Sequence, residues 1–196
     1  ADVTTHRADV ADREALARVL AGLPDLRGVF HAAGILEDQF LVNLEREAFE
    51  RVLGPKIAGA RNLDQLTRGR DLDFFVLFSS VAAALGSPGQ ANYAAGNAWM
   101  DALAVARRRE GLPGLSIAWG PWEDVGLAAA GDRRGVRLAD RGMESLDPEQ
   151  GVAILGRLLR DDTAHAIVMR LDLRQWRQYY PKVAMAPALS KMERSG

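Results

Sequence analysis

The sequence predicts an α/β protein with a Rossmann-like, doubly wound parallel sheet. The chain has 196 residues, of which 48% are hydrophobic, enough for one substantial core. Segments with the pattern of short strands alternate with longer segments of helical pattern, as in a sheet covered by helices on both faces. The continuous apolar run 74–78 is typical of a strand buried inside such a sheet.

The first predicted elements are short. We expect a strand over residues 3–10. Asp12 can accept hydrogen bonds from the free backbone N–H groups at the start of a helix, so we place a helix over 13–20 and end it at Gly22. The apolar segment 28–32 is predicted to be a strand that runs into a turn of small residues.

Two longer helices flank the central apolar strand. The segment 45–66 has a helical pattern, and Pro55 inside it is expected to bend the helix because proline lacks a backbone N–H. After strand 74–78 and a glycine- and proline-containing loop, the next helix is predicted over 92–109. That helix ends before a Gly-Leu-Pro segment, which is a typical stop signal.

The last third of the chain is predicted to hold a strand over 115–119, a helix over 148–159 and a strand over 166–169. Between them, residues 122–147 are rich in glycine, arginine and aspartate and show no clear periodicity. A connection of that length in a compact domain is often a lid, and we expect one here. The residues from 182 to 196 have the character of a C-terminal linker.

The composition excludes several classes of function. A formal net charge of −1 gives no indication of a nucleic-acid or membrane partner. The absence of cysteine excludes disulfides and thiolate metal sites, and the three histidines have no metal-ligand spacing, so no metal site is expected. No apolar window is long enough to span a membrane, and we expect a cytoplasmic protein. The first residue is not methionine, and we expect the chain to begin inside a longer polypeptide.

Four polar side chains are predicted to meet at one point. Tyr93 and Asn97 are four residues apart on the helix expected over 92–109, so they share one face. Ser80 follows the central strand and can reach the same place. A phenol, a hydroxyl and an amide that converge suit a site that donates a proton to a carbonyl oxygen. A nearby ammonium lowers the pKa of a phenol, and Lys56 on the preceding helix is the candidate.

These residues lie in motifs that resemble the ketoreductase domains of modular polyketide synthases, a branch of the short-chain dehydrogenase/reductase superfamily. The resemblance covers nearly the whole chain. In the wider superfamily a lysine lies four residues after the tyrosine, whereas in these ketoreductases lysine and asparagine exchange places, as Lys56 and Asn97 do here. The motifs that carry the resemblance are His31-Ala32-Ala33-Gly34, Lys56, Phe78-Ser79-Ser80, Gln90-Ala91-Asn92-Tyr93-Ala94-Ala95-Gly96-Asn97 and Trp119-Gly120-Pro121-Trp122.

The resemblance implies an NADPH-dependent reduction of a β-ketoacyl thioester carried on an acyl carrier protein, within residues 1–181. Tyr93 is then the general acid and Ser80 orients the β-keto group. Lys56 tunes the tyrosine and binds the nicotinamide ribose, while Asn97 holds the helix backbone or a water in a proton relay. The resemblance places these residues at the cofactor: Asp9, Val10, Ala32, Ala33, Gly34, Gly120 and Pro121. It places these at the substrate: Leu36, Asp38, Gln90 and Trp122.

The family also has positions that mark stereochemistry. One class carries a tryptophan eight residues before the tyrosine, where this chain has Leu85. The other class carries Leu-Asp-Asp after the small-residue turn, where this chain has Leu36-Glu37-Asp38. A proline two residues after the tyrosine marks selection of an epimerised α-carbon, and Ala95 stands there. The resemblance therefore implies the B1 type, which gives a D-configured β-hydroxyl without that selection.

The glycine-rich turn that holds a cofactor pyrophosphate in this fold does not precede Asp9. In the strand order 3-2-1-4-5-6, two further strands would separate residues 3–10 from strand 28–32. We therefore expect residues 3–10 to lack a neighbour and strand 28–32 to have an exposed apolar edge. We also expect the chain to bind NADPH poorly without a preceding N-terminal segment of the same domain.

Less specific interpretations stay open at this point. Lys56 on its own is a typical solvent-exposed helix lysine, and the run 107–109 of arginines is typical of a solvated helix end. A stand-alone dehydrogenase acting on diffusible substrates is one alternative function, which the lysine–asparagine exchange disfavours. A non-catalytic fragment that serves as scaffold or carrier-protein docking segment is the other, and the missing glycine-rich turn is its main support.

Overall fold

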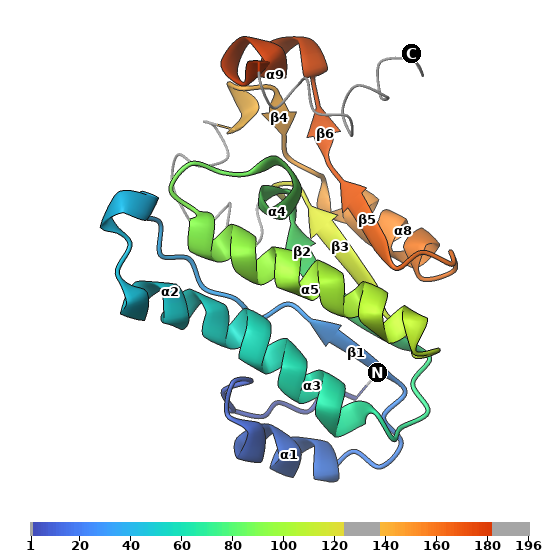
Figure 1. Cartoon of the computed structure of the whole chain (residues 1–196). Helices are drawn as coiled ribbons and strands as arrows, with labels where there is room; N and C mark the ends of the chain where they lie inside the picture. Colours follow the sequence, from blue (N-terminus) through green and yellow to red (C-terminus); the bar gives the residue numbers. More distant parts are fainter. Residues whose placement is uncertain (1, 124–137, 182–196) are drawn as a thin grey trace. The chain divides into compact units, whose positions relative to one another are not determined.

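The computed structural model describes residues 2–123 and 138–181 of the chain (Figure 1). These residues belong to two compact units. The first unit runs to Ala118 and includes Leu158–Ala166, and the second contains the described residues of Trp119–Arg157 and those from Ile167 onward. Most of the expected lid and the whole expected linker, 182–196, lie outside the described residues.

Parallel strands and helices alternate in the first unit, as predicted. Strands β1 and β2 pair in parallel with Gly28 opposite Phe74 and His31 opposite Leu77, and the four-stranded sheet has the order β1-β2-β3-β5. The strands of this sheet are β1 (Gly28–His31), β2 (Phe74–Ser80), β3 (Leu115–Trp119) and β5 (His165–Val168). The helices and helical turns of the first unit are α1 (Arg13–Ala21), η1 (Leu41–Asn43), α2 (Arg46–Leu53), η2 (Gly54–Gly59), α3 (Ala60–Thr67), α4 (Val81–Leu85) and α5 (Ala91–Arg109).

The second unit is built from shorter elements. Strands β4 (Met143–Glu144) and β6 (Arg170–Leu171) pair antiparallel. Helix α8 (Pro148–Leu158) precedes β5, and α9 (Leu173–Tyr179) begins at Asp172, whose side chain accepts hydrogen bonds from two backbone N–H groups of its first turn. Elements β4, β6 and α9, as well as the short α4 in the first unit, were not predicted, because each is too brief for its periodicity to be recognised.

Local sequence signals explain where the helices begin and bend. Asp12 caps α1 as predicted, with Oδ1 accepting from the N–H groups of Glu14 and Ala15 at 3.0 Å. The long helix expected over 45–66 is interrupted at Pro55, where η2 is a π-helical turn between α2 and α3. Proline offers no N–H to the preceding turn and its ring collides with a carbonyl there, and the wider π turn relieves this conflict.

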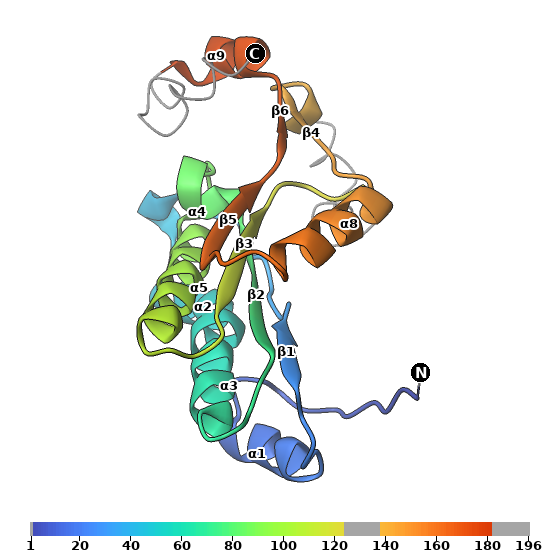
Figure 2. The same ribbon diagram turned by 90° about the vertical axis from the view of Figure 1, so that its right-hand side faces the viewer.

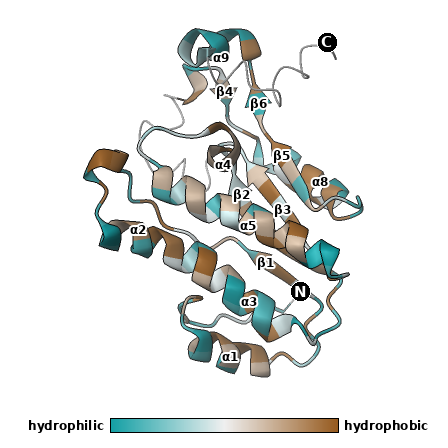
Figure 3. Cartoon of the chain, viewed as in Figure 1, coloured by the Kyte–Doolittle hydropathy of each residue, from teal (hydrophilic) through white to brown (hydrophobic). Residues whose placement is uncertain are grey.

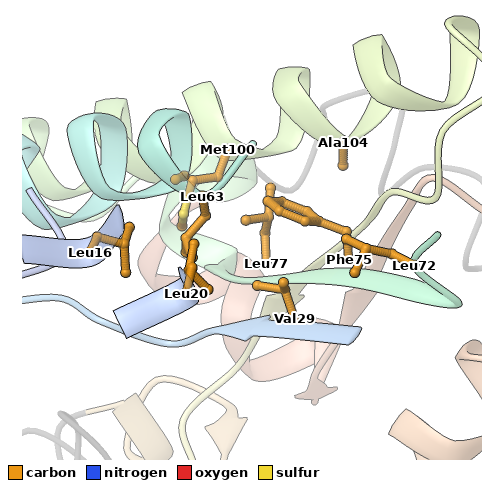
Figure 4. Packing of buried hydrophobic residues seen from close by; sticks show 10 residues of the cluster. Leu16, Leu20, Val29, Leu63, Leu72, Phe75, Leu77, Met100 and Ala104 are labelled. Atoms are coloured by element: carbon orange, nitrogen blue, oxygen red, sulfur yellow. The ribbon is translucent and has the colours of Figure 1, made fainter. Parts of the chain in front are cut away.

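The core of the first unit lies between helices and one face of the sheet. Figure 2 shows α3 and α5 on the same side of β1 and β2. Figure 4 shows the side chains that meet there, with Phe75 and Leu77 of β2 facing Leu63 of α3 and Met100 of α5. Phe75, Leu77 and Met100 are fully buried. This packing fixes the end of β2 relative to the start of α5, where the polar residues of interest lie.

The opposite face and the outer edge of β1 are open within the first unit. Phe30 of β1 is 48% exposed and its ring lies 4.8 Å from that of Phe74 and 6.4 Å from that of Phe78, centroid to centroid. Strand β1 is the terminal strand of the sheet, which confirms the expectation of an exposed apolar edge. A second group of exposed apolar side chains lies on and beside η1, coloured brown in Figure 3, and consists of Phe40, Leu41 and Val42.

The strand predicted over residues 3–10 is wrong. The described residues of this segment form no strand, and residues 2–9 are exposed. A strand requires hydrogen bonds to a neighbour, and the sheet of the described residues ends at β1 without including this segment. The segment ends in a turn in which Asp9 Oδ1 accepts the Ala11 N–H at 2.9 Å, just before α1.

Arg107 also departs from the interpretation of a solvated helix end. Its side chain is fully buried, with Nη1 2.5 Å from Asp64 Oδ1 and Nε donating to the Pro113 carbonyl at 2.8 Å. The guanidinium also lies 3.9 Å above the ring of Phe75. Arg68 Nε lies 3.1 Å from Oδ2, the other carboxylate oxygen of Asp64. Arg107 therefore joins the C-terminal end of α5 to α3 and to the loop before β3.

None of the helices in the described ranges is both long enough and apolar enough to cross a membrane.

The buried pair of Arg107 and Asp64 yields a stability prediction. Replacing Arg107 with Met should lower the free energy of unfolding by about 3 kcal/mol, because Asp64 stays buried with only the partly exposed Arg68 as partner. Chemical denaturation measures the change. Arg109→Met is the matched control at the exposed end of the same helix and should change stability by less than about 0.5 kcal/mol. Equal effects of the two substitutions would contradict a role for the buried pair.

Candidate active site

Helix α5 carries Tyr93 and Asn97 one turn apart. Tyr93 is half-buried in the first turn, and Asn97 is fully buried with Nδ2 donating to the Tyr93 carbonyl at 2.8 Å. The Ser79 hydroxyl donates to the Asn97 carbonyl at 3.4 Å and so links the end of β2 to the same turn. Asn97 Oδ1 is buried and accepts no hydrogen bond from the described residues, which leaves an acceptor for a bound group.

The π turn η2 places Lys56 under this part of α5. The lysine side chain is 2% exposed, its Nζ lies 5.1 Å from the centroid of the Tyr93 ring, and Nζ donates to the Phe78 carbonyl at 3.4 Å. The interpretation of Lys56 as a solvated helix lysine is therefore wrong. A buried ammonium over the face of an aromatic ring is attracted to that ring.

Two glycines leave the room that Lys56 occupies. A Cβ on Gly96 of α5 would lie 3.3 Å from Lys56 Cβ and 3.4 Å from Cδ, tighter than ordinary contact. A Cβ on Gly34 in the turn after β1 would lie 3.1 Å from Lys56 Cε and 3.3 Å from Nζ. The lysine is thus held between the small-residue turn and the tyrosine helix.

Burial governs the protonation of the two basic groups in this region. Desolvation lowers the pKa of Lys56 to about 8, against a smaller opposing effect of Asp101. Desolvation, followed by the charge of Lys56, lowers the pKa of His31 to about 4, and a hydrogen bond to the Pro55 backbone opposes the shift. At neutral pH the lysine therefore keeps its charge for the most part, while His31 is neutral and adds no competing charge.

Ser80 ends β2 and caps α4. Its Oγ accepts the Ala82 N–H at 3.2 Å, and the residue is half-buried. A hydroxyl that accepts a hydrogen bond still has its own hydrogen to donate. Ser80 therefore retains the donor that binding a ketone oxygen would require. Both β2 and α4 pack against α5, so Ser80 and Tyr93 lie on adjoining elements.

The segment that follows the small-residue turn lies against the start of α5. Asp38 accepts a hydrogen bond from Gln90 Nε2 at 3.1 Å, so two residues predicted at the substrate are directly linked. Glu37, which replaces the middle aspartate of the family motif, forms two bonds with Arg51, at 3.0 Å through Nε and 2.7 Å through Nη2. The additional methylene of glutamate lengthens the reach of this carboxylate. Leu36 is half-buried beside it.

Several residues predicted at the cofactor lie in the first unit. Ala33 and Gly34 are half-buried and Ala32 is exposed in the turn after β1. Val10 lies against Gly59 of the π turn, where an added Cβ would come within 2.7 Å of the valine Cγ2. Asn62 Nδ2 donates to the Val10 carbonyl at 3.0 Å and holds the Asp9–Val10 turn on α3.

The remaining predicted residues belong to the second unit. Gly120 and Pro121 are buried, and the Gly120 N–H donates to the Val168 carbonyl at 2.7 Å. Trp122 is half-buried, with its ring 4.9 Å from that of the buried Trp119. The Trp122 ring also covers Gly151 of α8 so closely that a Cβ there would overlap it.

The chemistry of Lys56 suits a hydroxyl-bearing group better than a metal ion. A lysine ammonium has only donors to offer, and a ribose hydroxyl can accept from them, whereas a metal ion needs lone pairs. No group of three His, Cys, Asp or Glu side chains among the described residues could hold a metal ion.

Asn92 was not predicted as a separate candidate. Its amide is fully buried, with Nδ2 donating to the Glu37 carbonyl at 3.0 Å and Oδ1 accepting the Tyr93 N–H at 2.8 Å. An asparagine in the first turn of a predicted helix was the available signal, since asparagine there often accepts from a free backbone N–H.

Comparison with known proteins shows the family of this chain. The family model described as KR domain matches residues 1–124. The chain belongs to the ketoreductase (KR) domain family. Its relatives place it with the polyketide synthase ketoreductases of the short-chain dehydrogenase/reductase superfamily, which confirms the resemblance of the motifs and the predicted fold class. Ketoreductase domains of this superfamily use a nicotinamide cofactor.

The relatives are much longer than this chain. The spectinabilin polyketide synthase system protein NorA' of Streptomyces orinoci is 47% identical over 84% of the chain, which spans 5% of that protein. The pikromycin polyketide synthase component PikAII of Streptomyces venezuelae is 42% identical over 99% of the chain and 5% of its own length.

Solved ketoreductases show the same fold. An A1-type ketoreductase is 37% identical with a TM-score of 0.89, and the match covers 96% of the chain and 42% of that structure. The first ketoreductase of the tylosin polyketide synthase is 41% identical with a TM-score of 0.82, covering 94% of the chain and 42% of that structure. The chain thus spans less than half of these ketoreductases.

The burial of Lys56 leads to a prediction for the pH dependence of stability. The pKa of Lys56 is about 8 in the folded protein against 10.5 for an unperturbed lysine. Between these values the unfolded chain carries the proton and the folded protein does not, so raising the pH stabilises the folded state. Relative to Lys56→Met, the wild type should gain about 3 kcal/mol of unfolding free energy from pH 7 to pH 11. Urea denaturation of both proteins over this range measures the difference, and parallel pH profiles would contradict it.

The packing of Trp122 on Gly151 leads to a second prediction. Alanine normally stabilises a helix interior relative to glycine, by up to about 1 kcal/mol. Gly151→Ala should instead lower the free energy of unfolding by about 2 kcal/mol, because the new Cβ would overlap the Trp122 ring. Denaturation followed by tryptophan fluorescence measures it, and Trp122→Leu should restore much of the loss. Val152→Ala, 63% exposed on the same helix, is the control.

Proposed function

We propose that this chain carries the catalytic residues for NADPH-dependent reduction of a β-ketoacyl thioester, bound to an acyl carrier protein, to the β-hydroxyacyl thioester. The observation that supports this most strongly is the buried Lys56 ammonium beside the ring of Tyr93. A lysine is costly to bury, and this one is held between Gly34 and Gly96. Its position has a direct explanation if the phenol must pass through an anionic state.

In the proposed reaction Tyr93 is the general acid. Bound NADPH supplies the hydride that reduces the β-carbon of the ketone. The Ser80 hydroxyl, whose oxygen already accepts from Ala82, donates its hydrogen to the ketone oxygen and orients it. Tyr93 transfers its phenolic proton to the same oxygen as negative charge develops there, and the Lys56 ammonium stabilises the resulting phenolate. Asn97 holds the helix backbone at the Tyr93 carbonyl, and Oδ1 remains available for a water that returns the proton.

The cofactor assignments follow from the resemblance together with the contacts. Lys56 would bind the nicotinamide ribose, and the small-residue turn 32–34 would pack beside it. Asp9 and Val10 would contact the adenine end from the turn that Asn62 holds. Gly120 and Pro121 would line the nicotinamide, and Trp122 the substrate, on the resemblance alone. NADPH in preference to NADH is likewise proposed from the family.

We infer B1-type stereochemistry, a D-configured β-hydroxyl without α-epimer selection. Asp38 retains the last aspartate of the family motif and is held by Gln90 beside the start of the tyrosine helix. Leu85 stands where the other class has tryptophan, and Ala95 where epimer selection has proline. The backbone alone does not discriminate, since A-type ketoreductases match with TM-scores of 0.89.

We further infer that another segment of the same domain completes the first unit. The open edge of β1 and the exposed ring of Phe30 support this, because a parallel strand of this fold normally has neighbours on both sides. Such a segment would also supply the phosphate-binding turn. The proposed organisation is a catalytic part over 1–181, with a lid over about 122–147, followed by a linker over 182–196.

Turnover tests the proposed function. NADPH oxidation with a β-ketothioester surrogate is measured for this chain alone and for the chain joined to the N-terminal segment of its domain. We expect activity only in the joined protein. Tyr93→Phe, which removes only the hydroxyl, should lower kcat by about a thousandfold. Tyr179→Phe, on an exposed tyrosine of α9, is the matched control and should retain activity.

Two results would overturn the assignment. A joined protein that is folded and binds NADPH but reduces no β-ketothioester would favour the scaffold or carrier-docking alternative. Full activity in Tyr93→Phe would remove the tyrosine from the proton-transfer step.

A further inference from the structure

The start of α5 and the segment Glu37–Gln39 are joined by several bonds. The Gln39 N–H donates to the Gly89 carbonyl at 2.8 Å, and Gln39 and Gln90 form an isolated parallel bridge. Gln90 Nε2 donates to Asp38 Oδ1 at 3.1 Å. These contacts bring a segment that follows β1 against a helix that begins more than fifty residues later in the chain.

The first turn of α5 lacks the usual capping bond. The first N–H groups of a helix have no partner in the helix itself, and the N-cap side chain usually accepts from one of them. Gln90 is the N-cap residue, but its side chain makes no such bond, and its Nε2 donates to Asp38. Asn92 takes over this role, with Oδ1 accepting the Tyr93 N–H at 2.8 Å.

The nitrogen of the same Asn92 amide binds the segment Glu37–Gln39. Asn92 Nδ2 donates to the Glu37 carbonyl at 3.0 Å, and the residue is 0% exposed. One buried carboxamide thus connects the backbone N–H of Tyr93 with the peptide that joins Glu37 to Asp38. The Asn92 side chain is shielded from water, whereas the Glu37–Arg51 bonds of the same segment are exposed, so we expect the asparagine link to be stiffer than that ion pair.

We propose that Asn92 is a positioning residue, whose amide fixes Asp38 relative to Tyr93 and thereby helps to select the face of the ketone that is reduced. The inference rests on the proposed function, in which Tyr93 gives the proton and Asp38 guides the substrate. Neither family marker includes Asn92, and its side chain contacts neither reacting group, so it acts through the backbone of both segments.

The ion pair of Glu37 and Arg51 holds the segment from the other side. Its side chains are 29% and 57% exposed, so water and salt weaken it. The Asn92 side chain, by contrast, is 0% exposed. Disturbing the asparagine should therefore affect selectivity more than disturbing the ion pair.

Asn92→Asp separates the two functions of the amide. The new carboxylate keeps an oxygen for the Tyr93 N–H but presents an oxygen instead of a donor to the Glu37 carbonyl. Asn92→Ala removes both bonds and adds no charge, so it carries the test if the aspartate variant does not fold. Asn43→Asp makes the same chemical change on an exposed asparagine of η1 and is the control.

The experiment measures the ratio of the two β-hydroxyl enantiomers, together with kcat and KM, in the native polypeptide that contains this chain. Asn92→Asp should lower the enantiomer ratio about tenfold, as expected for loss of one buried hydrogen bond. Asp38→Ala should lower it to a similar degree, and the double variant should show no further loss, because both act on one restraint. An unchanged ratio in folded Asn92→Asp or Asn92→Ala, or additive losses in the double variant, would overturn the proposal.

Hydrogen exchange separates failure of this inference from failure of the proposed function. In Asn92→Asp the Gln39 N–H should exchange faster while the Tyr93 N–H stays protected, and in Asn92→Ala both should exchange faster. Unchanged exchange at Gln39 would overturn the link whatever the activity. If the variants show these changes in hydrogen exchange but the wild-type protein reduces no β-ketothioester, only the proposed function is overturned.

Discussion

The arrangement of the first unit depends on the burial of one cation. Lys56 has given up most of its hydration and compensates with the Phe78 carbonyl and the face of the Tyr93 ring. That position requires a helix that widens at Pro55 and two glycines with no side chain to obstruct the lysine. Changes to the π turn, the small-residue turn or α5 would therefore act on the same ammonium, although these elements are distant in sequence.

Some polar residues around Lys56 present chemical groups, and others hold the backbone that carries those groups. Tyr93, Ser80 and Lys56 present the groups that suit proton donation to a carbonyl oxygen. Asn97 and Asn92 use their amides on the helix backbone above and below the tyrosine, and so determine where it lies. Because both asparagines are fully buried, internal hydrogen bonds hold the backbone of Tyr93.

Sequence patterns predicted the strongly periodic elements and the meeting of Tyr93 with Asn97, since helical spacing alone places these two on one face. They did not predict the burial of Lys56, because a proline in a helical pattern indicates a bend and does not reveal a π turn. They also misplaced Arg107, whose neighbours Arg108 and Arg109 suggested a solvated run. Its burial depends on Asp64, a residue 43 positions away that local pattern does not connect to it.

The glycine at position 96 has a consequence for attempts to engineer this domain. Glycine in the interior of a long helix is the kind of residue that stability-guided redesign replaces with alanine, to reduce the entropy of the unfolded chain. Here the added methyl group would press on the stem of Lys56 at 3.3 Å. A gain in melting temperature could then be accompanied by a displaced ammonium, so thermostability screens alone would favour variants with impaired chemistry.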